Sequence, residues 1–233
     1  MSDAAEQSLG GVALLGDMKP AERATLEQQC AFRRYMAGEQ IFDRQSDSRD
    51  LFCVVRGTVR VVVYSVSGRE VSFEDIAAGG YFGELACLDS RPRSASVVAV
   101  TNTVVAAISP PVMERVLLEH PKISLALMRR LTRMIRQATE RIVDLSTLGA
   151  NNRVYAELLR LAKPNPKDAG KTSVIRPVPI HGDIAARVST TRETVARVLS
   201  DLGKKHLVIK EGASLIINDI KRLRDMVEQF RID

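Results

Sequence analysis

Short apolar runs and alternating polar–apolar runs dominate the chain from Phe32 to Ser109. A period of two residues predicts strands, and many short strands separated by glycine predict a β-barrel or sandwich rather than strand–helix units. Ser67 and Gly68 stand between two of the runs, where we expect a tight hairpin turn. The runs are QIF, LFCVV, TVRVVVYSV, EVSFEDI, SASVVAV and VVAAI.

Helical spacing replaces this pattern on both sides of the β region. Residues 12–30 are typical of a short helical start, with Pro20 near the beginning of a helix. Pro121 stands just before a helical stretch at about 122–148, whose apolar positions recur every three or four residues. This narrow seam favours a contact between two helices of a dimer, and the alternative is a helix packed on its own domain. The seam positions are Leu127, Leu131, Met134, Ala138, Arg141/Ile142, Leu145 and Leu148.

The last third of the chain has the element order of a winged helix-turn-helix. A helix begins near Asn151 and is followed by a loop rich in Pro, Gly and Lys at 163–172. A short strand in SVIRPVPI then precedes two helix patterns, HGDIAARV and TTRETVARVLSDLGKKH. Two strands, HLVIKE and SLIIND, meet at Gly212 and Ala213 and are expected to form the wing.

Composition limits the class of protein. The chain is 45% hydrophobic and 27% charged, as in a folded domain. Its start lacks a secretion signal, and no apolar run reaches the ~18 residues that cross a bilayer, so we expect a cytoplasmic protein without membrane contact. The cysteines, Cys30, Cys53 and Cys87, are too widely spaced for a disulfide framework or a clustered metal site.

Charge is unevenly distributed along the chain. Residues 1–148 contain 18 Lys/Arg and 18 Asp/Glu, whereas residues 149–233 contain 16 Lys/Arg and 10 Asp/Glu. The whole net charge of +6 therefore lies in the last third. This indicates a polyanion partner for that segment, and the alternative is a basic surface kept for solubility.

The segment GGYFGELACLDSRPRSASVVA has the residue types of a phosphate and sugar site. Gly83 lets the backbone approach a ligand closely. Glu84 opens a short helical turn whose free N–H groups can cradle an anion. Arg93 can hold a phosphate through two parallel hydrogen bonds, and Ser94 adds a hydroxyl and a backbone donor. This set fits a compact nucleotide, and the alternative is a structural Arg–Glu ion pair.

The segment TTRETVARVLS has the pattern of a DNA-reading helix. Thr190 and Glu193 fit a capping box that would begin the helix there. Apolar positions at spacings of three and four form an inward stripe, so the first turns of the opposite face present Arg192, Glu193 and Arg197. Arginine can bridge guanine O6 and N7, and glutamate can accept from cytosine N4. The alternative is a solvated Glu193–Arg197 salt bridge.

Over about residues 12–225, these motifs resemble in content and order the CRP/FNR superfamily of bacterial transcription regulators. The sequences F-G-E-L and P-R-S-A match the phosphate-binding cassette of that family. The resemblance implies cAMP or cGMP as the allosteric ligand. It assigns the ribose 2′-hydroxyl to Glu84 and to the backbone of Gly83 and Leu85, and the cyclic phosphate to Arg93 and Ser94.

The same resemblance implies which residues contact the base of the nucleotide and which contact the DNA operator. It places Ala138 and Thr139 where the family has two adjacent hydroxyl residues that contact adenine, so one hydroxyl is missing and the preference between cAMP and cGMP stays open. The intact R-E-T-V-x-R sequence implies half-sites of the TGTGA type. The implied DNA contacts are Thr191, Arg192, Glu193 and Arg197.

The expected fold is α+β in three parts. These are a β-roll (jelly-roll) cyclic-nucleotide-binding domain at 1–110, a dimerisation helix at 111–148 and a winged helix-turn-helix at 149–233. The resemblance implies a homodimer that binds double-stranded DNA and contacts RNA polymerase, without catalytic or metal residues.

Three rival interpretations remain. A family member could answer to another signal or act without ligand. A nucleotide-cleaving enzyme would need a general base or metal ligands near Arg93, and none is apparent. A nucleotide-gated module without DNA binding is disfavoured by the basic last third.

Overall fold

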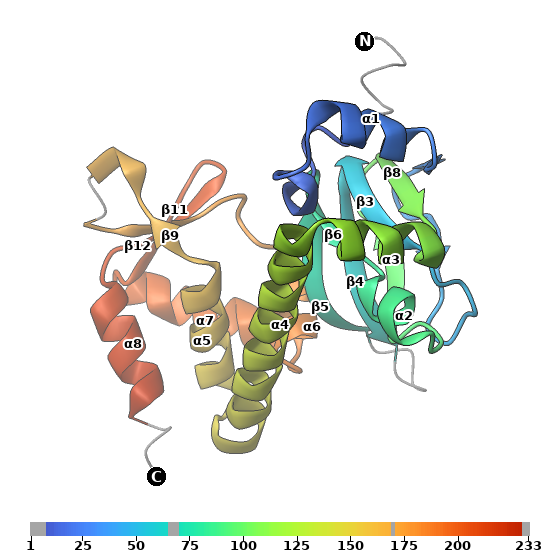
Figure 1. The fold of residues 1–233 in the computed structure, drawn as a ribbon. Coiled ribbons are helices and arrows are strands. Elements are labelled where there is room, and N and C mark those ends of the chain that lie inside the picture. Colours follow the sequence, from blue (N-terminus) through green and yellow to red (C-terminus); the bar gives the residue numbers. More distant parts are fainter. Residues whose placement is uncertain (1–7, 65–69, 169–170, 230–233) are drawn as a thin grey trace. The chain divides into compact units, whose positions relative to one another are not determined.

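The structure is a computed structural model that describes residues 8–64, 70–168 and 171–229 (Figure 1). It divides into two compact units, Met1–Met134 and Ile135–Asp233, and each has its own hydrophobic core. The hairpin turn predicted at Ser67 and Gly68 lies outside the described residues. Within the described ranges, no helix has the length and apolar character needed to cross a bilayer.

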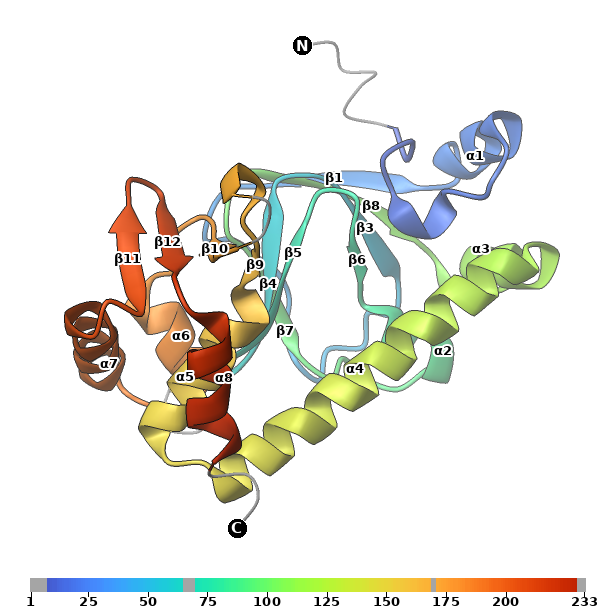
Figure 2. The same ribbon diagram turned by 90° about the vertical axis from the view of Figure 1, so that its left-hand side faces the viewer.

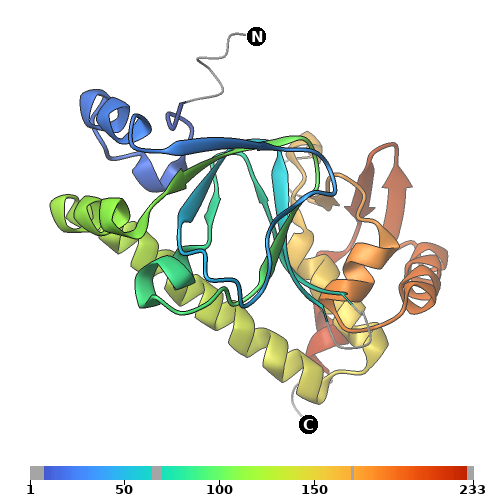
Figure 3. The same ribbon diagram turned by 90° about the vertical axis from the view of Figure 1, so that its right-hand side faces the viewer.

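Two four-stranded antiparallel sheets face each other in the first unit (Figure 3). One has the strand order β1-β8-β3-β6 and the other the order β2-β7-β4-β5. Phe42 of the second sheet packs against Phe52 and Phe82 of the first, with ring centroids 5.6 and 5.8 Å away, so the aromatic rings join the sheets. The strands are β1 (Ala31–Tyr35), β2 (Gln40–Phe42), β3 (Leu51–Arg56), β4 (Thr58–Tyr64), β5 (Glu70–Ala77), β6 (Tyr81–Phe82), β7 (Ser96–Ala99) and β8 (Thr103–Ile108).

Helices flank these sheets, and proline is the first residue of α1, α3 and α4, where its missing N–H costs no helical hydrogen bond. The helical start predicted for residues 12–30 contains a 3₁₀ turn and α1. The long stretch predicted at about 122–148 is α4. The elements are a 3₁₀ turn (Ala13–Leu15), α1 (Pro20–Glu27), α2 (Glu84–Asp89), α3 (Pro110–Glu119) and α4 (Pro121–Thr147).

The exposed apolar seam of α4 differs from the predicted one. Leu127 and Leu148 are buried in the cores of their own units, at 3% and 4% exposure. Ile135, which the prediction left out, is 68% exposed, and Met128 and Ile142 are 55% and 64% exposed. The predicted seam therefore mixed two faces of the helix, because residues that differ by one position lie about 100° apart on an α-helix. The outward seam follows Met128, Leu131, Ile135, Ala138, Ile142 and Leu145.

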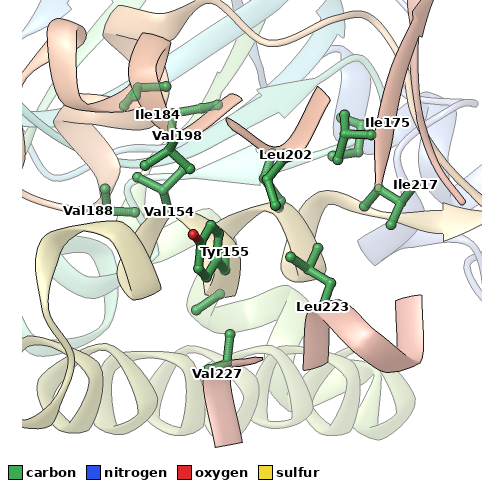
Figure 4. Close-up of a cluster of buried hydrophobic side chains, with 14 of the residues drawn as sticks. Val154, Tyr155, Ile175, Ile184, Val188, Val198, Leu202, Ile217, Leu223 and Val227 are labelled. Atoms are coloured by element: carbon green, nitrogen blue, oxygen red, sulfur yellow. The ribbon is translucent and has the colours of Figure 1, made fainter. Parts of the chain in front are cut away.

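The second unit combines a helical bundle with a small sheet of order β11-β12-β10-β9. Figure 4 shows side chains from α5, α6, α7, α8 and the sheet meeting in one core. Figure 2 shows the β11–β12 hairpin following α7 as the wing. The elements are α5 (Ala150–Leu161), β9 (Lys163–Pro164), a 3₁₀ turn (Pro166–Asp168), β10 (Ser173–Ile175), α6 (His181–Arg187), α7 (Arg192–Lys204), β11 (Val208–Glu211), β12 (Ser214–Ile217) and α8 (Ile220–Glu228).

The predicted α+β fold is confirmed: a β-roll, a long helix and a winged helix-turn-helix follow one another along the chain. The elements that the sequence pattern did not predict are short or terminal. They are β1, the two-residue strands β6 and β9, and α8, whose Leu223 and Val227 are buried in the second core. The single helix predicted at 111–148 is divided into two helices, α3 and α4.

Candidate functional sites

A tight turn between β6 and α2 forms the first candidate site. Gly83 occupies the left-handed region at φ +81° and caps α2. A Cβ atom there would lie 2.6 Å from Nη1 of Arg93 and 3.0 Å from the carbonyl oxygen of Asp50. Both the backbone conformation and the close approach require glycine at this position. The turn thus places the start of α2 directly against the Arg93 guanidinium.

Arg93 is almost completely buried, at 2% exposure. Its Nε donates to Ser48 Oγ at 3.0 Å, its Nη1 to the Gly83 carbonyl at 2.9 Å and its Nη2 to the Asp50 carbonyl at 2.8 Å. The guanidinium also lies over the Phe42 ring, 4.1 Å from its centroid. Burial lowers the pKa of Arg93, but arginine stays protonated at neutral pH. Because a guanidinium has five N–H groups, two remain for an anion.

Glu84 is the first residue of α2 and is 4% exposed. Burial raises the pKa of its carboxyl group, whereas the bond from its own backbone N–H and the charge of Arg130 lower that pKa. The site therefore holds a carboxylate in a poorly hydrated position, where a hydroxyl donor would satisfy it.

Arg130 of α4 belongs to the same site, although the sequence pattern did not predict it. Its Nε lies 4.0 Å from Glu84 Oε1, its Nη2 pairs with Glu74 of β5 at 3.0 Å, and its guanidinium lies 4.9 Å from the Tyr81 ring centroid. The Nε atom is buried and has no hydrogen-bond partner among the described residues. Ile123 and Leu127 are buried four residues apart, and the next position on that face, three residues later, is Arg130. This helical spacing could have indicated that Arg130 faces inward.

The remaining nucleotide-site candidates are more exposed than Glu84 and Arg93. Leu85 is 38% exposed and Ser94 is exposed, so both border the turn on its solvent side. Thr139 belongs to the second unit and is exposed on α4, where its hydroxyl donates to the Ile135 carbonyl at 3.0 Å. The structure thus brings together Gly83, Glu84 and Arg93 in the first unit, and the base contact predicted for Thr139 stays a prediction.

The second candidate site is the exposed face of α7. Arg192, Glu193 and Arg197 are all exposed, while Val195 and Val198 are buried. The described residues show no Glu193–Arg197 ion pair. Hydrogen bonds from its own backbone N–H and from the Thr191 hydroxyl lower the pKa of Glu193, so its carboxylate is charged at neutral pH.

The predicted start of this helix was wrong by one residue. Thr191, not Thr190, is the N-cap, and its hydroxyl accepts from the Thr194 N–H at 3.2 Å. Thr190 instead donates its backbone N–H to the Ala185 carbonyl of α6 at 3.0 Å, which keeps it in the turn between the two helices. Only Thr190 has a glutamate three residues later, so the capping-box pattern favoured it, but the path of the turn makes Thr191 the cap.

One arginine of α5 fixes that turn. Arg153 donates to the carbonyl oxygens of Val188 and Ser189 at 2.8 and 3.1 Å, and to that of Leu148 at 2.9 Å. Helix α7 therefore follows a turn whose backbone carbonyls accept hydrogen bonds from a partly buried guanidinium. Its exposed first turn is correspondingly well positioned.

Comparison with known families assigns a domain to each of the two regions that contain these candidate sites. Residues 32–120 match the model of the cyclic nucleotide-binding domain, and residues 152–226 match that of the Crp-like helix-turn-helix domain. A domain of the first kind followed by one of the second defines a transcription regulator with a nucleotide-binding and a DNA-binding part. The chain belongs to the CRP/FNR superfamily.

Individual relatives support this assignment. The chain is 33% identical over 176 residues to the cyclic AMP receptor protein of Thermus thermophilus, covering 76% of this chain and 78% of that protein. It is 25% identical over 218 residues to the CRP-like cAMP-activated global transcriptional regulator of Mycobacterium tuberculosis, covering 94% and 97%. A CooA mutant of Carboxydothermus hydrogenoformans has the same fold, with a TM-score of 0.76, 19% identity, and 88% and 90% coverage.

Proposed function

We propose that this regulator is a homodimer that binds cAMP or cGMP in its β-roll and, in response, binds a TGTGA-type palindrome through its reading helices. The observation that carries the proposal is that a buried carboxylate, Glu84, and a buried guanidinium, Arg93, lie at the same glycine turn before α2. Relatives that are named as cAMP-activated or cAMP-receptor proteins support the choice of ligand.

The cassette residues would divide the nucleotide between them. The two free N–H groups of Arg93 and the hydroxyl of Ser94 would hold the cyclic phosphate. Glu84, with the backbone of Gly83 and Leu85, would accept the ribose 2′-hydroxyl. A hydroxyl donor compensates Glu84 for its lost hydration, which makes a sugar a good partner for a buried carboxylate. Arg130 would stabilise the charged form of Glu84 from the other side.

The long helix would supply the base contact and the dimer. Thr139 would bond the base, while Ala138 lacks the second hydroxyl, so the discrimination between the two nucleotides depends on one side chain. The outward apolar seam of α4, with Ile135 68% exposed, is suited to burial against the same seam of a second copy. We assign residues 1–110 to the sensor, 111–148 to dimerisation and 149–233 to DNA binding.

The exposed face of α7 would read the operator. Arg192 and Arg197 would contact guanines, Glu193 would accept from cytosine, and Thr191 would contact the backbone beside them. The role is regulatory rather than enzymatic, in the cytoplasm, with RNA polymerase as the further partner.

The decisive test titrates cAMP and cGMP by calorimetry into the purified full chain and, separately, measures its binding to a duplex with a TGTGA palindrome. We expect one nucleotide to bind and to change the affinity for this duplex but not for a scrambled duplex. Palindrome binding that neither nucleotide changes, without calorimetric heat, would instead identify a regulator that acts without ligand or answers to another signal.

A further inference from the structure

Four charged side chains form a continuous chain of ion pairs in the second unit, and its two carboxylates are buried. Arg160 of α5 contacts Asp144 of α4 through Nη2, and its Nη1 donates to Glu157 Oε2 at 3.3 Å. The Nη1 atom of Arg187, in α6, lies 3.7 Å from Glu157 Oε1. The side chains of Asp144 and Glu157 are only 5% and 3% exposed. The chain of charges thus runs from α4 through α5 to the first helix of the helix-turn-helix.

Asp144 attaches the part of α4 that belongs to the second unit to the rest of that unit. Among residues 135–147 of the helix, Asp144 is the single buried residue, and it lies between exposed apolar neighbours, Val143 and Leu145. Leu148, which is buried in the core, comes only after the helix has ended. The helical turns of α4 in this unit are therefore anchored through a carboxylate rather than through apolar packing.

Such an anchor restricts geometry more than it adds stability. Two charges removed from water regain in mutual attraction about what they lose in hydration, so apolar replacements of buried ion pairs are often as stable. An arginine that bonds two carboxylates with separate nitrogens, however, fixes the relative position of the groups that carry them. Arg160 does this for Asp144 and Glu157, and Glu157 continues the link to Arg187.

We propose that this ion chain positions the helix-turn-helix relative to the last turns of α4, so that a movement of α4 reaches the DNA-reading helix. α7 follows α6 because the Thr190 N–H is bonded to the Ala185 carbonyl. The inference rests on the proposed function, since the movement of α4 would come from nucleotide binding. Asp144, Arg160, Glu157 and Arg187 are then positioning residues for the coupling between nucleotide and DNA.

The test uses the full-length double variant Asp144→Asn/Arg160→Gln. Removing both charges together leaves Glu157 and Arg187 as a neutral pair, which avoids the uncompensated buried charge of a single substitution. Arg222→Gln/Asp225→Asn on the exposed face of α8 makes the same two changes away from the ion chain and serves as the control. Two affinities are measured for each protein: that for cAMP or cGMP, and that for the palindromic duplex with and without the nucleotide.

We expect the double variant to bind the nucleotide as the unchanged protein does but to lose the nucleotide response of DNA binding. Allosteric responses are commonly about 5- to 150-fold, and the variant's should fall below about 3-fold while the control keeps its own. An undiminished response would overturn the inference. So would an equal loss of DNA affinity with and without nucleotide, because a merely structural role predicts that result. If the unchanged protein binds no nucleotide, the proposed function itself fails, and the inference with it.

Discussion

Arg93 carries structural bonds as well as the proposed phosphate contact, and Arg93→Met separates the two. Methionine keeps much of the volume over the Phe42 ring but removes the donors to Ser48, Gly83 and Asp50. Ser48 is exposed and can turn to water. Losing a hydrogen bond to a carbonyl costs about 1–3 kcal/mol. Both carbonyls are at the low end of this range, because that of Gly83 still accepts from the Cys87 N–H at 3.3 Å and Asp50 is only half-buried.

The lost cation–π contact adds about 1 kcal/mol, and release from the cost of burying a charge offsets part of the total. We therefore expect the ligand-free β-roll to lose about 2–4 kcal/mol, which corresponds to a fall in melting temperature of roughly 6–15 °C for a unit of this size.

Thermal and urea unfolding of the nucleotide-free protein measure this loss. Arg91→Met is the matched control, because Arg91 is two residues away and exposed. The nucleotide that binds should raise the melting temperature of the control and leave that of Arg93→Met unchanged. A nucleotide-free Arg93→Met protein as stable as the control would refute the structural role derived from the three hydrogen bonds.

Three further predictions concern other residues. Burial raises the pKa of Glu84, so the stability that its protonated form provides is present at acidic pH and is lost as the pH rises through that raised pKa. Glu84→Gln should therefore stabilise the ligand-free protein at pH 7 and remove this loss of stability from a pH series of urea unfolding. The same variant should weaken nucleotide binding in calorimetry. Glu193→Ala should reduce the preference at one base pair of each half-site by roughly 5- to 150-fold in competition with single-substituted duplexes, and an unaltered preference would mean that Glu193 does not read a base. Ile135→Lys should shift the protein from dimer to monomer in sedimentation at micromolar concentration, whereas Gln137→Lys, which is exposed on the opposite side of the same helical turn, should not. A dimeric Ile135→Lys protein would exclude the outward seam of α4 as the interface.

The parts of the sites that the sequence could predict are local in the chain. Gly83, Glu84 and Arg93 lie within eleven residues, and their types alone indicate a turn, a carboxylate and a phosphate-binding guanidinium. The partners of Arg93 could not be found in this way. Ser48 and Asp50 reach it from a loop more than forty residues earlier, and their role follows from the folding of the sheets.

The errors on the helices have a similar cause. Periodicity shows that α4 is amphipathic, but which of two adjacent apolar rows faces outward depends on what packs beside it, so Ile135 was overlooked in favour of Met134. Arg130 was missed for the same reason, although Tyr81, Glu74 and Glu84 surround it. A charged residue on the inner face of a helix is visible only when the opposing groups are known.

The three bonds from Arg93 to its own domain also affect how related sequences should be interpreted. A descendant that stopped answering to nucleotides would still need an arginine there to hold the loop before β3 and the turn before α2. Selection for folding would preserve that residue long after selection for sensing had ended. Ser94 is exposed and makes no such structural bonds to the described part of the ligand-free domain, so it could be substituted without loss of folding. Its substitution would therefore indicate the loss of ligand binding earlier than any change at Arg93.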